Sequence, residues 1–416
     1  MILSQSNLLG KTRKEVPKEA ETASHKFLLK AGYIDQLAAG VWSLLPLGFQ
    51  THKKIENIIR EEMEGINGQE IFLPTLQPKN LWIETGRWDT IDPPLFKIKD
   101  RHKKEFGLGP THEEVITDLA RTNIASYKQL PMMVFQIQNK FRNEVRSSGG
   151  LLRVREFIMK DLYSFHQDEK DLDKYYKKVH AAYHRIFKRC GLNAVSVEAE
   201  SGSIGGNFCH EFMVLADSGE DKVIMCSDCG WAANAEVTKL KDACPKCNKK
   251  TVTKKAIEAG HIFKLGDTYS KKMKATYLNK AGQQKPVVMG CYGIGLGRLM
   301  ASIVEANHDN DGIIWPETVS PFAIHLLQLS TEAKAVKMSK QITEYCQKYR
   351  VGLLYDDRDL SPAQKLKDAD LIGISLRLVV SQRSLADNKV EIKYRAKKSP
   401  QLTTLEELFQ IIQNAK

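Results

Sequence analysis

The sequence predicts a protein in three parts: a larger α+β domain with antiparallel strands, a small cysteine ribbon inserted into it, and a C-terminal α/β domain. The first supporting observation is a pair of apolar segments, residues 132–141 and 150–159, which a Ser-Ser-Gly-Gly turn joins. The second is a double Cys-x2-Cys pattern between residues 226 and 247. The third is an alternation of short apolar strands and helical segments after residue 321.

The elements before the antiparallel pair are predicted from hydrophobic spacing and from residues that end helices and strands. Helical spacing predicts helices over residues 18–31, which end before Gly32, and over residues 49–63. Residues 70–74 form an apolar run that Pro74 ends, which indicates a strand.

The residues Thr111-His112-Glu113-Glu114 predict the start of another helix. Thr111 is a good N-cap, and Glu114 stands three residues later, so the two would form a capping box. A capping box gives Thr111 and Glu114 a purely structural purpose, but it leaves Glu113 unexplained.

The remaining elements follow the antiparallel pair in chain order. The expected helices cover residues 168–188, 299–307, 331–349, 361–371 and 403–414, and the expected strands cover residues 285–289, 322–329, 351–355, 376–381 and 390–394. A boundary is expected near residues 318–321. The larger domain is thus assigned to residues 1–225 and 256–318, the ribbon to 226–255, and the C-terminal domain to 320–416.

Composition places the chain among soluble globular proteins. The 416 residues are 42% hydrophobic and 27% charged, and they contain no apolar run of 18 residues that would suggest a membrane span. The N-terminus lacks the apolar core of a secretory signal, so a cytoplasmic location is expected. The net charge of +12 favours an acidic partner such as nucleic acid, and residues 239–255 hold seven lysines against one acid.

Four of the eight cysteines have the spacing of a metal site. They fall as Cys226-x2-Cys229-x14-Cys244-x2-Cys247, which predicts a closed tetrahedral zinc site with a structural purpose. A redox dithiol or coincidence would also produce the pattern.

Arginines crowd the turn between the two antiparallel segments. Residues 141–157 read FRNEVRSSGGLLRVREF, with four arginines on the two arms of the turn. A solvated, charged hairpin would explain them. A clamp for an anion would explain them too, because planar guanidinium groups match carboxylates and phosphates.

A glycine-rich segment, GCYGIGLGR at residues 290–298, joins a predicted strand to a predicted helix. It lacks the Lys-Ser/Thr of a P-loop, and its glycines do not fit GxGxxG. The glycines suit close packing of the helix on the strand. They equally suit a phosphate site in which the helix N-terminus and Arg298 act together.

With these residues in place, the chain resembles the bacterial-type prolyl-tRNA synthetases, which are class II aminoacyl-tRNA synthetases. The resemblance runs nearly end to end, through the segments QLAAGVWSLLPLG, LGPTHEEVITDLAR, FRNEVR…REFIMKDLYSFH, GHIFKLG, MGCYGIGLGR and GIIWPE. It implies a catalytic domain built on a mostly antiparallel sheet. It also implies an anticodon-binding domain from residue 320 and a homodimer, with Pro74 as the interface proline.

The resemblance also implies roles for individual residues. Arg142 would hold the α-phosphate of ATP and the carboxylate of proline, and Arg298 would hold the γ-phosphate, so these two are the expected catalytic residues. Thr111 and Glu113 would receive the imino group of proline, and His210 would lie near the amino acid. Further contacts with ATP are expected from Glu144, Arg153, Phe157, Gly293 and Gly295.

The implied activity is the attachment of L-proline to tRNA(Pro) through a prolyl-adenylate, with ATP as substrate and Mg²⁺ on its phosphates. The chain departs from many relatives in two ways: it has no large editing insertion between the second and third motifs, and its hairpin tip is small. Two alternatives stay open. One is a synthetase-derived tRNA-binding or regulatory protein, and the other is a class II synthetase for another amino acid, such as threonine or serine.

Overall fold

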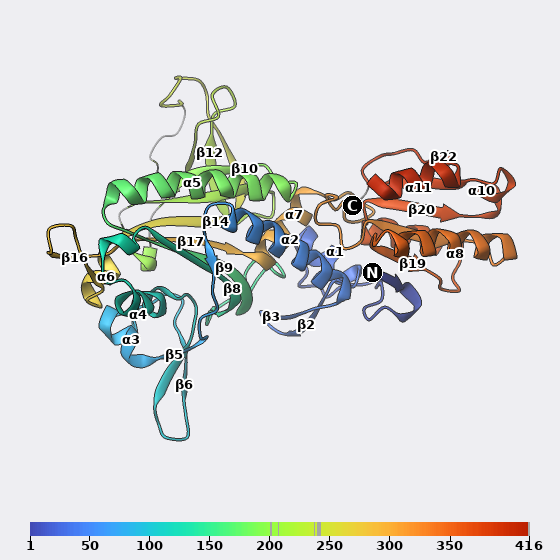
Figure 1. The fold of residues 1–416 in the computed structure, drawn as a ribbon. Helices are drawn as coiled ribbons and strands as arrows, with labels where there is room; N and C mark the ends of the chain where they lie inside the picture. The colour runs from blue at the N-terminus through green and yellow to red at the C-terminus, as the bar shows by residue number, and fades with distance from the viewer. Residues whose placement is uncertain (200–201, 207, 237, 239–242, 415–416) are drawn as a thin grey trace. The chain divides into compact units, whose positions relative to one another are not determined.

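The computed structural model describes residues 1–199, 202–206, 208–236, 238 and 243–414 (Figure 1). The chain divides into two compact units. The first consists of Ala38–Val41 and Glu56–Ser302, and the second of Met1–Leu37, Trp42–Ile55 and Ile303–Lys416. Among the described residues, no helix has the length and apolar character needed to cross a membrane.

A large, mostly antiparallel sheet forms the centre of the first unit (Figure 1). Its main path runs in the order β10, β11, β14, β17, β9, β8, β4, and only the β4–β8 pair on this path is parallel. The strands are β4 (Gln69–Glu70), β8 (Met132–Phe141), β9 (Glu156–His166), β10 (Ala194–Ala199), β11 (Phe208–Leu215), β14 (Val252–Gly266) and β17 (Val288–Gly295). The predicted sheet type is therefore confirmed.

Two expected strands of this sheet have different limits. The strand expected over residues 70–74 is only the short β4, after which the chain leaves the sheet. The returning arm expected from residue 150 begins at Glu156, because residues 142–155 form a folded loop instead of continuing the β8–β9 ladder.

The long helix α5 (Glu169–Arg189) covers one face of the sheet (Figure 1). Its buried stripe consists of Leu172, Tyr175, Tyr176, Val179, Ala182, Tyr183, Ile186 and Phe187. The opposite face packs at one end against α4 (Glu113–Asn123) and α6 (Thr268–Lys272), and α3 (Lys79–Thr85) packs on these two helices. The rest of that face carries the candidate site.

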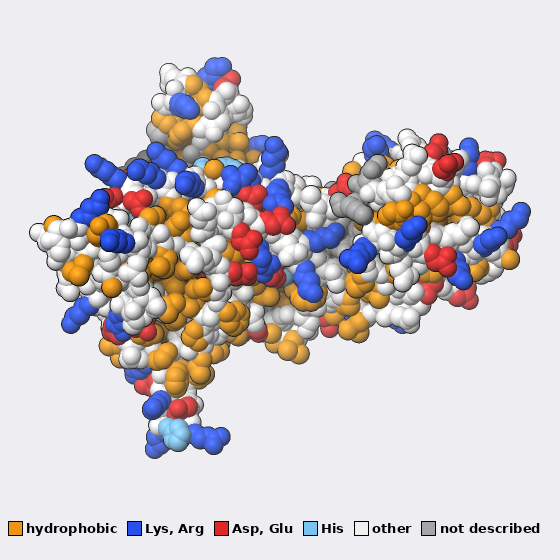
Figure 2. Space-filling model, viewed as in Figure 1, with side chains coloured by type: hydrophobic (Ala, Val, Ile, Leu, Met, Phe, Trp, Pro, Cys, Tyr) orange, Lys and Arg blue, Asp and Glu red, His pale blue; other side chains and the backbone are white. Residues whose placement is uncertain are grey.

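Smaller strands project from this unit. The strands β5 (Leu76–Pro78), β6 (Phe96–Lys99) and β7 (Glu105–Leu108) form one sheet, and β15 (Thr276–Leu278) pairs with β16 (Gln284–Pro286). Figure 2 shows lysine and arginine side chains at the end of the β6–β7 hairpin. The strands β12 (Asp221–Met225) and β13 (Ala232–Asn234) support the cysteine ribbon, of which residues 237 and 239–242 lie outside the described residues.

The second unit contains a mixed sheet in the order β1, β19, β18, β20, β21, β22. These strands are β1 (Ile2–Ser4), β18 (Ile324–Gln328), β19 (Leu353–Asp356), β20 (Leu376–Val380), β21 (Val390–Tyr394) and β22 (Gln401–Thr403). The helices α8 (Ala333–Lys348), α9 (Pro362–Ile372), α10 (Gln382–Ala386) and α11 (Leu405–Asn414) alternate with the strands from residue 324 onward. The expected α/β arrangement is present, with an N-terminal edge strand that sequence analysis did not foresee.

The N-terminal helices differ from expectation mainly at their ends. The first, α1 (Ala23–Lys30), begins after an N-cap at Thr22, whose hydroxyl accepts a hydrogen bond from the backbone of His25. The second, α2 (Pro46–Glu64), starts three residues earlier than predicted, and β2 (Ile34–Ala38) and β3 (Val41–Leu44) lie between α1 and α2. Helix α7 (Leu296–Ala306) directly follows β17.

Candidate active site

Strand alternation brings the candidate site together on one face of the central sheet. In register across β11, β14, β17 and β9, Glu211 pairs with His261, His261 with Gly293, and Gly293 with Asp161. Because side chains alternate along a strand, residues two apart share a face. The site face therefore includes Cys209, Glu211, His261, Phe263, Cys291, Gly293, Gly295, Phe157, Met159, Asp161 and Tyr163.

The glycine-rich segment lies within a strand instead of a loop. Expected to follow a strand that ends at residue 289, it forms β17 as far as Gly295, and α7 begins at Leu296. A Cβ atom added to Gly295 would lie 3.8 Å from Cβ of Arg298 and 4.0 Å from Cδ2 of Phe157. The glycines thus leave the sheet face open between Phe157 and Arg298, while Arg298 stands in the first turn of α7.

Two arginines from different elements converge beside this open floor. The guanidinium of Arg142 lies 5.2 Å from the ring centre of Phe157. The Arg298 guanidinium donates from Nε to the carbonyl of Leu152 at 2.9 Å and from Nη1 to Oε2 of Glu258 at 3.1 Å. The pKa of Arg142 is lowered, mainly because the side chain is buried and secondly because the positive charge of Arg298 lies close to it. A like-charged pair of this kind favours binding of an anion between its members.

The arginine-rich loop is tied together internally. The Nε atom of Arg153 donates to Oε2 of Glu144 at 3.0 Å, and Nε of Arg155 donates to the Glu144 carbonyl at 3.2 Å. At the tip, Ser148 Oγ donates to Oε1 of Glu220 at 3.1 Å, a contact that sequence analysis did not foresee. Gly149, with φ of +63°, adopts the left-handed conformation that favours glycine. The small tip is therefore a defined turn.

The predicted capping box at Thr111 is wrong. The helix α4 begins at Glu113 with His112 as its N-cap, and no side chain caps it. The Glu114 carboxylate instead accepts hydrogen bonds from Thr85 Oγ1 at 2.8 Å and from Arg87 Nη1 at 2.9 Å. The Glu114 side chain, which the local sequence pattern assigned to the helix cap, therefore binds residues from another part of the chain.

The Glu113 carboxylate is buried at the edge of the site, and only one of its two oxygen atoms has a hydrogen-bond partner among the described residues. Its Oε1 accepts a hydrogen bond from Cys291 Sγ at 3.1 Å. Its Oε2 is buried without a hydrogen-bond partner among the described residues, and the nearest cation, Nη1 of Arg87, lies 3.8 Å away. An unpaired buried carboxylate oxygen is costly, so this atom is suited to a cationic ligand.

A buried polar network supports the segment that carries Thr111 and Glu113. The hydroxyl of Tyr163 accepts a hydrogen bond from the His112 backbone at 3.0 Å and donates to Asp161 at 3.0 Å. Asp161 also pairs with the fully buried Lys140 at 2.8 Å. Burial and, next, the charge of Lys140 lower the pKa of His112 to about 4, so this histidine is neutral near pH 7.

A group of acidic and histidine side chains lies beside Arg298. One ligand atom each of Glu211, Glu258 and His261 lies within 4.8 Å of the others. Burial opposes ionisation of Glu258, but hydrogen bonding and charge from His261, together with Arg298, lower the pKa of Glu258 to about 2. Burial and then the Glu258 charge raise the pKa of Glu211 to about 7.

No local sequence pattern indicated a role for this acidic group. His261 belongs to the segment GHIFKLG, and Glu258 stands three residues before it. This Glu-x-x-His spacing was the one sequence feature that could have indicated the group. The proximity of Glu258 to Arg298 depends on the approach of β14 to α7, which no local pattern contains.

His210 lies on the other face of the sheet from the site. Its Nδ1 is 2.9 Å from the hydroxyl of Tyr176 on α5, and its ring packs against Phe208. The neighbours Cys209 and Glu211 on the same strand face the site instead. The alternation of β11 therefore does not support the expected contact between His210 and the amino acid.

The four ribbon cysteines come together as the spacing predicted. The Sγ atoms of Cys226 and Cys247, and those of Cys229 and Cys244, are 3.5 Å apart, and all four lie within 4.8 Å of one another. Gly230, with φ of +71°, directly follows the first knuckle. Tetrahedral zinc with bonds of about 2.3 Å requires sulfur atoms about 3.8 Å apart, so the thiols fit that ion.

Two family models together match the greater part of the chain. The model described as the tRNA synthetase class II core domain (G, H, P, S and T) matches residues 96–307. The model described as an anticodon binding domain matches residues 319–415.

Curated relatives match the chain over nearly its whole length. The proline--tRNA ligase of Desulforamulus reducens is 36% identical over 542 aligned positions, which cover 94% of this chain and 95% of the relative. That of Geotalea daltonii is 37% identical over 556 positions, covering 97% of each. Since this chain has 416 residues, both relatives contain a long segment that it lacks.

Solved structures share the fold. The prolyl-tRNA synthetase of Cryptosporidium parvum, complexed with halofuginone and AMPPNP, superimposes with a TM-score of 0.77 at 16% identity, covering 97% of this chain and 80% of that one. The prolyl-tRNA synthetase of Giardia lamblia, complexed with prolyl-adenylate, gives a TM-score of 0.76 at 18% identity, covering 94% and 78%.

Proposed function

Because the chain belongs to the proline--tRNA ligase family of class II aminoacyl-tRNA synthetases, we propose that it attaches L-proline to tRNA(Pro) at the expense of ATP. The structural observation that carries this proposal is the buried, unpartnered oxygen of Glu113 at the edge of a floor flanked by Arg142 and Arg298. A cationic imino group and anionic phosphates are the ligands that such a site would bind together.

In the first step, a carboxylate oxygen of proline attacks the α-phosphorus of ATP. The bond between this phosphorus and the bridging oxygen breaks, which gives prolyl-adenylate and pyrophosphate. Arg142 holds the α-phosphate and the proline carboxylate, and Arg298 holds the γ-phosphate. Neither arginine forms a covalent bond, since orientation of the reactants and compensation of developing charge lower the barrier.

The nucleotide lies over the glycine floor in this proposal. Phe157 stacks on the adenine, and Glu144 contacts its edge. Gly293 and Gly295 allow the nucleotide to approach the strand closely, because a larger side chain at Gly295 would occupy the space between Phe157 and Arg298, and one at Gly293 would lie over Met159. Arg153, which pairs with Glu144 in this structure, would reach the nucleotide by exchanging that partner for a phosphate or ribose oxygen.

The amino acid lies at the Glu113 end of the floor. Oε2 of Glu113 accepts a hydrogen bond from the imino group of proline, and Thr111 lies beside it. In the second step, the 3′-terminal hydroxyl of the tRNA attacks the carbonyl carbon of the adenylate. AMP leaves, and the proton of the hydroxyl passes to a phosphate oxygen or to water.

Glu258 and Glu211 would hold the Mg²⁺ ion that accompanies ATP, with His261 orienting Glu258. Burial and, next, the charge of Glu258 raise the pKa of Glu211 to about 7, and a divalent cation bound by both carboxylates would offset these two costs of ionising Glu211. Bound there, the ion would neutralise phosphate charge. Arg298, already paired with Glu258, lies at the same place and would contact the γ-phosphate beside it.

The four ribbon cysteines would bind one structural Zn²⁺ ion. Their donor set, all sulfur with no open position among the four, suits a closed site that stabilises the ribbon.

The assembly is proposed to be a cytoplasmic homodimer. Phe72, Pro74 and Leu76 alternate along an extended segment and are all exposed, with Phe72 at 77% and Leu76 at 45%. An extended row of exposed apolar side chains is suited to pairing with the same row of a second copy. Light scattering of Phe72→Asp, expected to be monomeric where the wild type is dimeric, tests this assignment.

The decisive experiment is amino-acid-dependent exchange of pyrophosphate into ATP, with a panel that includes proline, threonine, serine and alanine. Exchange that depends on proline supports the proposal. Exchange that depends on threonine or serine would identify a synthetase for another amino acid, and exchange with none would support a tRNA-binding or regulatory protein. No large editing insertion is present, so hydrolysis of mischarged alanyl-tRNA is expected to require a separate protein.

A further inference from the structure

Arg87 is held in place directly after the C-terminal end of helix α3. Gly86 has φ of +77°, the left-handed conformation that ends many helices, and the backbone N–H of Arg87 donates to the Trp82 carbonyl at 2.9 Å. The Arg87 guanidinium lies 5.3 Å from the ring centre of Trp82 and 5.4 Å from that of Tyr269, and only 8% of the residue is exposed. The helix end and the two rings together fix this cation beside the amino acid site.

Two buried carboxylates share the charge of Arg87. Its Nη1 donates to Oε1 of Glu114 at 2.9 Å and lies 3.8 Å from Oε2 of Glu113. Both glutamates belong to the first turn of α4, and neither is exposed. The Oε2 atoms of both glutamates, and Nε and Nη2 of Arg87, are buried without a hydrogen-bond partner among the described residues. Two anions and one cation leave one negative charge, which a ligand with a single positive charge would neutralise.

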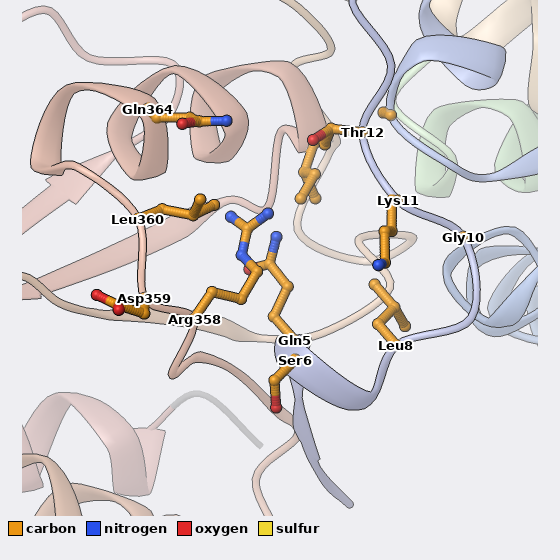
Figure 3. A pocket seen from close by; sticks show the side chains of 12 residues that line it. Gln5, Ser6, Leu8, Gly10, Lys11, Thr12, Arg358, Asp359, Leu360 and Gln364 are labelled. Atoms are coloured by element: carbon orange, nitrogen blue, oxygen red, sulfur yellow. The ribbon is translucent and has the colours of Figure 1, made fainter.

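A second arginine shows how such a group looks when the guanidinium has a full set of carboxylate partners. Arg358 lines a pocket of the second unit (Figure 3). It donates from Nε and Nη2 to Asp356, each at 2.8 Å, and from Nη1 to Asp368 at 2.9 Å. All three nitrogen atoms of Arg358 thus bind carboxylates, whereas Arg87 uses only one for this purpose. The group at Arg87 is therefore incomplete as a purely structural salt bridge.

Charged and titratable groups act on Glu113 from every element packed around it. Besides Arg87 and Glu114, they are Tyr163 of β9, Tyr269 of α6, Cys291 of β17 and Arg142 of the arginine-rich loop. Burial raises the pKa of Tyr163, Tyr269 and Cys291 well above their usual values, so these three groups are neutral near pH 7. In the proposed function, Arg142 binds the proline carboxylate and the α-phosphate. Arg87 is then the cation that acts on Glu113.

We propose that Arg87 is a positioning residue for the amino acid: its charge keeps Glu113 ionised next to Glu114, and thereby determines the affinity for the imino cation of proline. The inference rests on the proposed function. Two carboxylates that share a buried site do not both stay ionised without a nearby cation. Burial raises the pKa of Glu114, the charge of Arg87 lowers it, and the charge of Glu113 raises it again.

Loss of the Arg87 charge would leave two buried anions side by side. One proton would then bind to the pair and be shared between Glu113 and Glu114. A protonated Glu113 cannot form a bond between opposite charges with the imino cation, so affinity for proline would fall as pH falls. ATP binds at the other end of the floor and would be little affected.

The experiment measures proline-dependent pyrophosphate exchange of full-length variants at several pH values between about 6 and 9. Arg87→Met removes the charge but keeps an apolar chain between the two rings, and Arg87→Lys keeps the charge. Arg87→Met combined with Glu114→Gln removes the cation together with one of the two anions. Arg121→Met is the matched control, because it removes a cation of α4 that pairs with Glu84 and Asp118 instead.

In Arg87→Met, the KM for proline should be about tenfold or more above the wild-type value near pH 6 and should approach that value near pH 9. The KM for ATP should stay within about twofold of the wild type at each pH. Arg87→Lys and Arg121→Met should keep the pH dependence of the wild type. The variant with Glu114→Gln added should recover most of the loss, since Glu113 then has no charged neighbour with which to share a proton.

Thermal unfolding measures the same ionisation without any substrate. A carboxyl whose pKa in the folded state lies above its unfolded value near 4.3 makes the protein less stable as pH rises above 4.3. The difference in melting temperature between wild type and Arg87→Met should therefore widen from about pH 5 to about pH 8, by about 3–5 °C for each unit of pKa increase. Addition of Glu114→Gln should reduce this widening.

A KM for proline in Arg87→Met that differs from the wild type by the same factor at every pH would overturn the inference, because the effect would then be one of packing. A combined variant no better than Arg87→Met would overturn it too. If Arg87→Met does not fold, recovery of folding by Glu114→Gln supports the inference, and failure of both variants to fold counts against it. A wild type without proline-dependent exchange contradicts the proposed function; the melting temperatures then decide the inference, which fails if their difference does not widen with pH.

Discussion

Replacement of Glu113 by glutamine tests the amino acid site most directly. The Oε2 atom of Glu113 is buried, lacks a hydrogen-bond partner among the described residues, and lies 3.8 Å from Arg87, whose Nη1 already donates to Glu114 at 2.9 Å. The imino group of proline would therefore be its principal partner. A hydrogen bond between charged groups contributes about 1.5–3 kcal/mol, or roughly 10- to 150-fold in affinity. Glutamine keeps the shape and removes the charge.

The expected result for Glu113→Gln is a KM for proline raised by about 10- to 150-fold, with the KM for ATP nearly unchanged. Pyrophosphate exchange at varied proline and ATP concentrations measures both quantities. Glu114→Gln is the matched control, because the carboxylate of Glu114 is used by Thr85 and Arg87. It should lower the melting temperature more than it changes the KM for proline. A Glu113→Gln enzyme whose KM for proline stays within twofold of the wild type would refute the assignment.

Three further predictions concern other parts of the chain. Arg142→Ala should reduce pyrophosphate exchange at least about a thousandfold, whereas Arg146→Ala, on the same loop but exposed, should stay near the wild-type rate; similar losses in both would contradict the assignment. Metal analysis should find one zinc per chain in the wild type and none in the Cys226→Ser, Cys244→Ser variant. Burial lowers the pKa of His325 to about 3, below its unfolded value near 6.5, so the stability that its neutral form contributes is lost as pH falls from 6.5 towards 3. At pH 4.5 the wild type should have lost about 3 kcal/mol more than His325→Asn, measured by urea unfolding; equal losses would contradict the pKa shift.

Local sequence patterns predicted the limits of an element well where those limits depend only on the element's own residues and its immediate neighbours. The strand expected over residues 132–141 has the limits of β8, because its alternation and its flanking proline are both local signals. The helices expected over residues 331–349 and 361–371 differ from α8 and α9 by two residues or fewer at each end. Hydrophobic period and caps are sufficient at these places.

Prediction failed where a distant segment supplies the partner. Thr111 and Glu114 have the local form of a capping box, but Thr85 and Arg87 bind the Glu114 carboxylate. Strand β1 could not be assigned to the C-terminal sheet, since its partner Leu353 is some 350 residues away. Burial and long-range pairing outweigh a local preference of about 1 kcal/mol in such cases.

His210 illustrates a third kind of limit. The family resemblance placed His210 near the amino acid, and its strand β11 does border the site. Which side chains face the site depends on the pairing of β11 with β14, which places Glu211 opposite His261. A shift of one residue exchanges the two faces of a strand, so a motif can identify the right strand and still assign the wrong side chain.

The charges of the site explain why its residues act as one unit. Without ligands, the guanidinium groups of Arg142 and Arg298 repel each other, and Glu258 compensates only part of this repulsion through its bond to Arg298. The unpaired oxygen of Glu113 adds an opposite cost at the other end of the floor. A ligand that carries a cation at one end and a phosphate at the other offsets both costs, whereas pyrophosphate, which has no cationic group, offsets only the repulsion between the arginines. Prolyl-adenylate should therefore stabilise the fold more than the same concentration of pyrophosphate, since a ligand that binds only the native state raises the unfolding free energy by RT ln(1 + L/Kd), where L is the free ligand concentration, and this amount is larger for the ligand that binds more tightly.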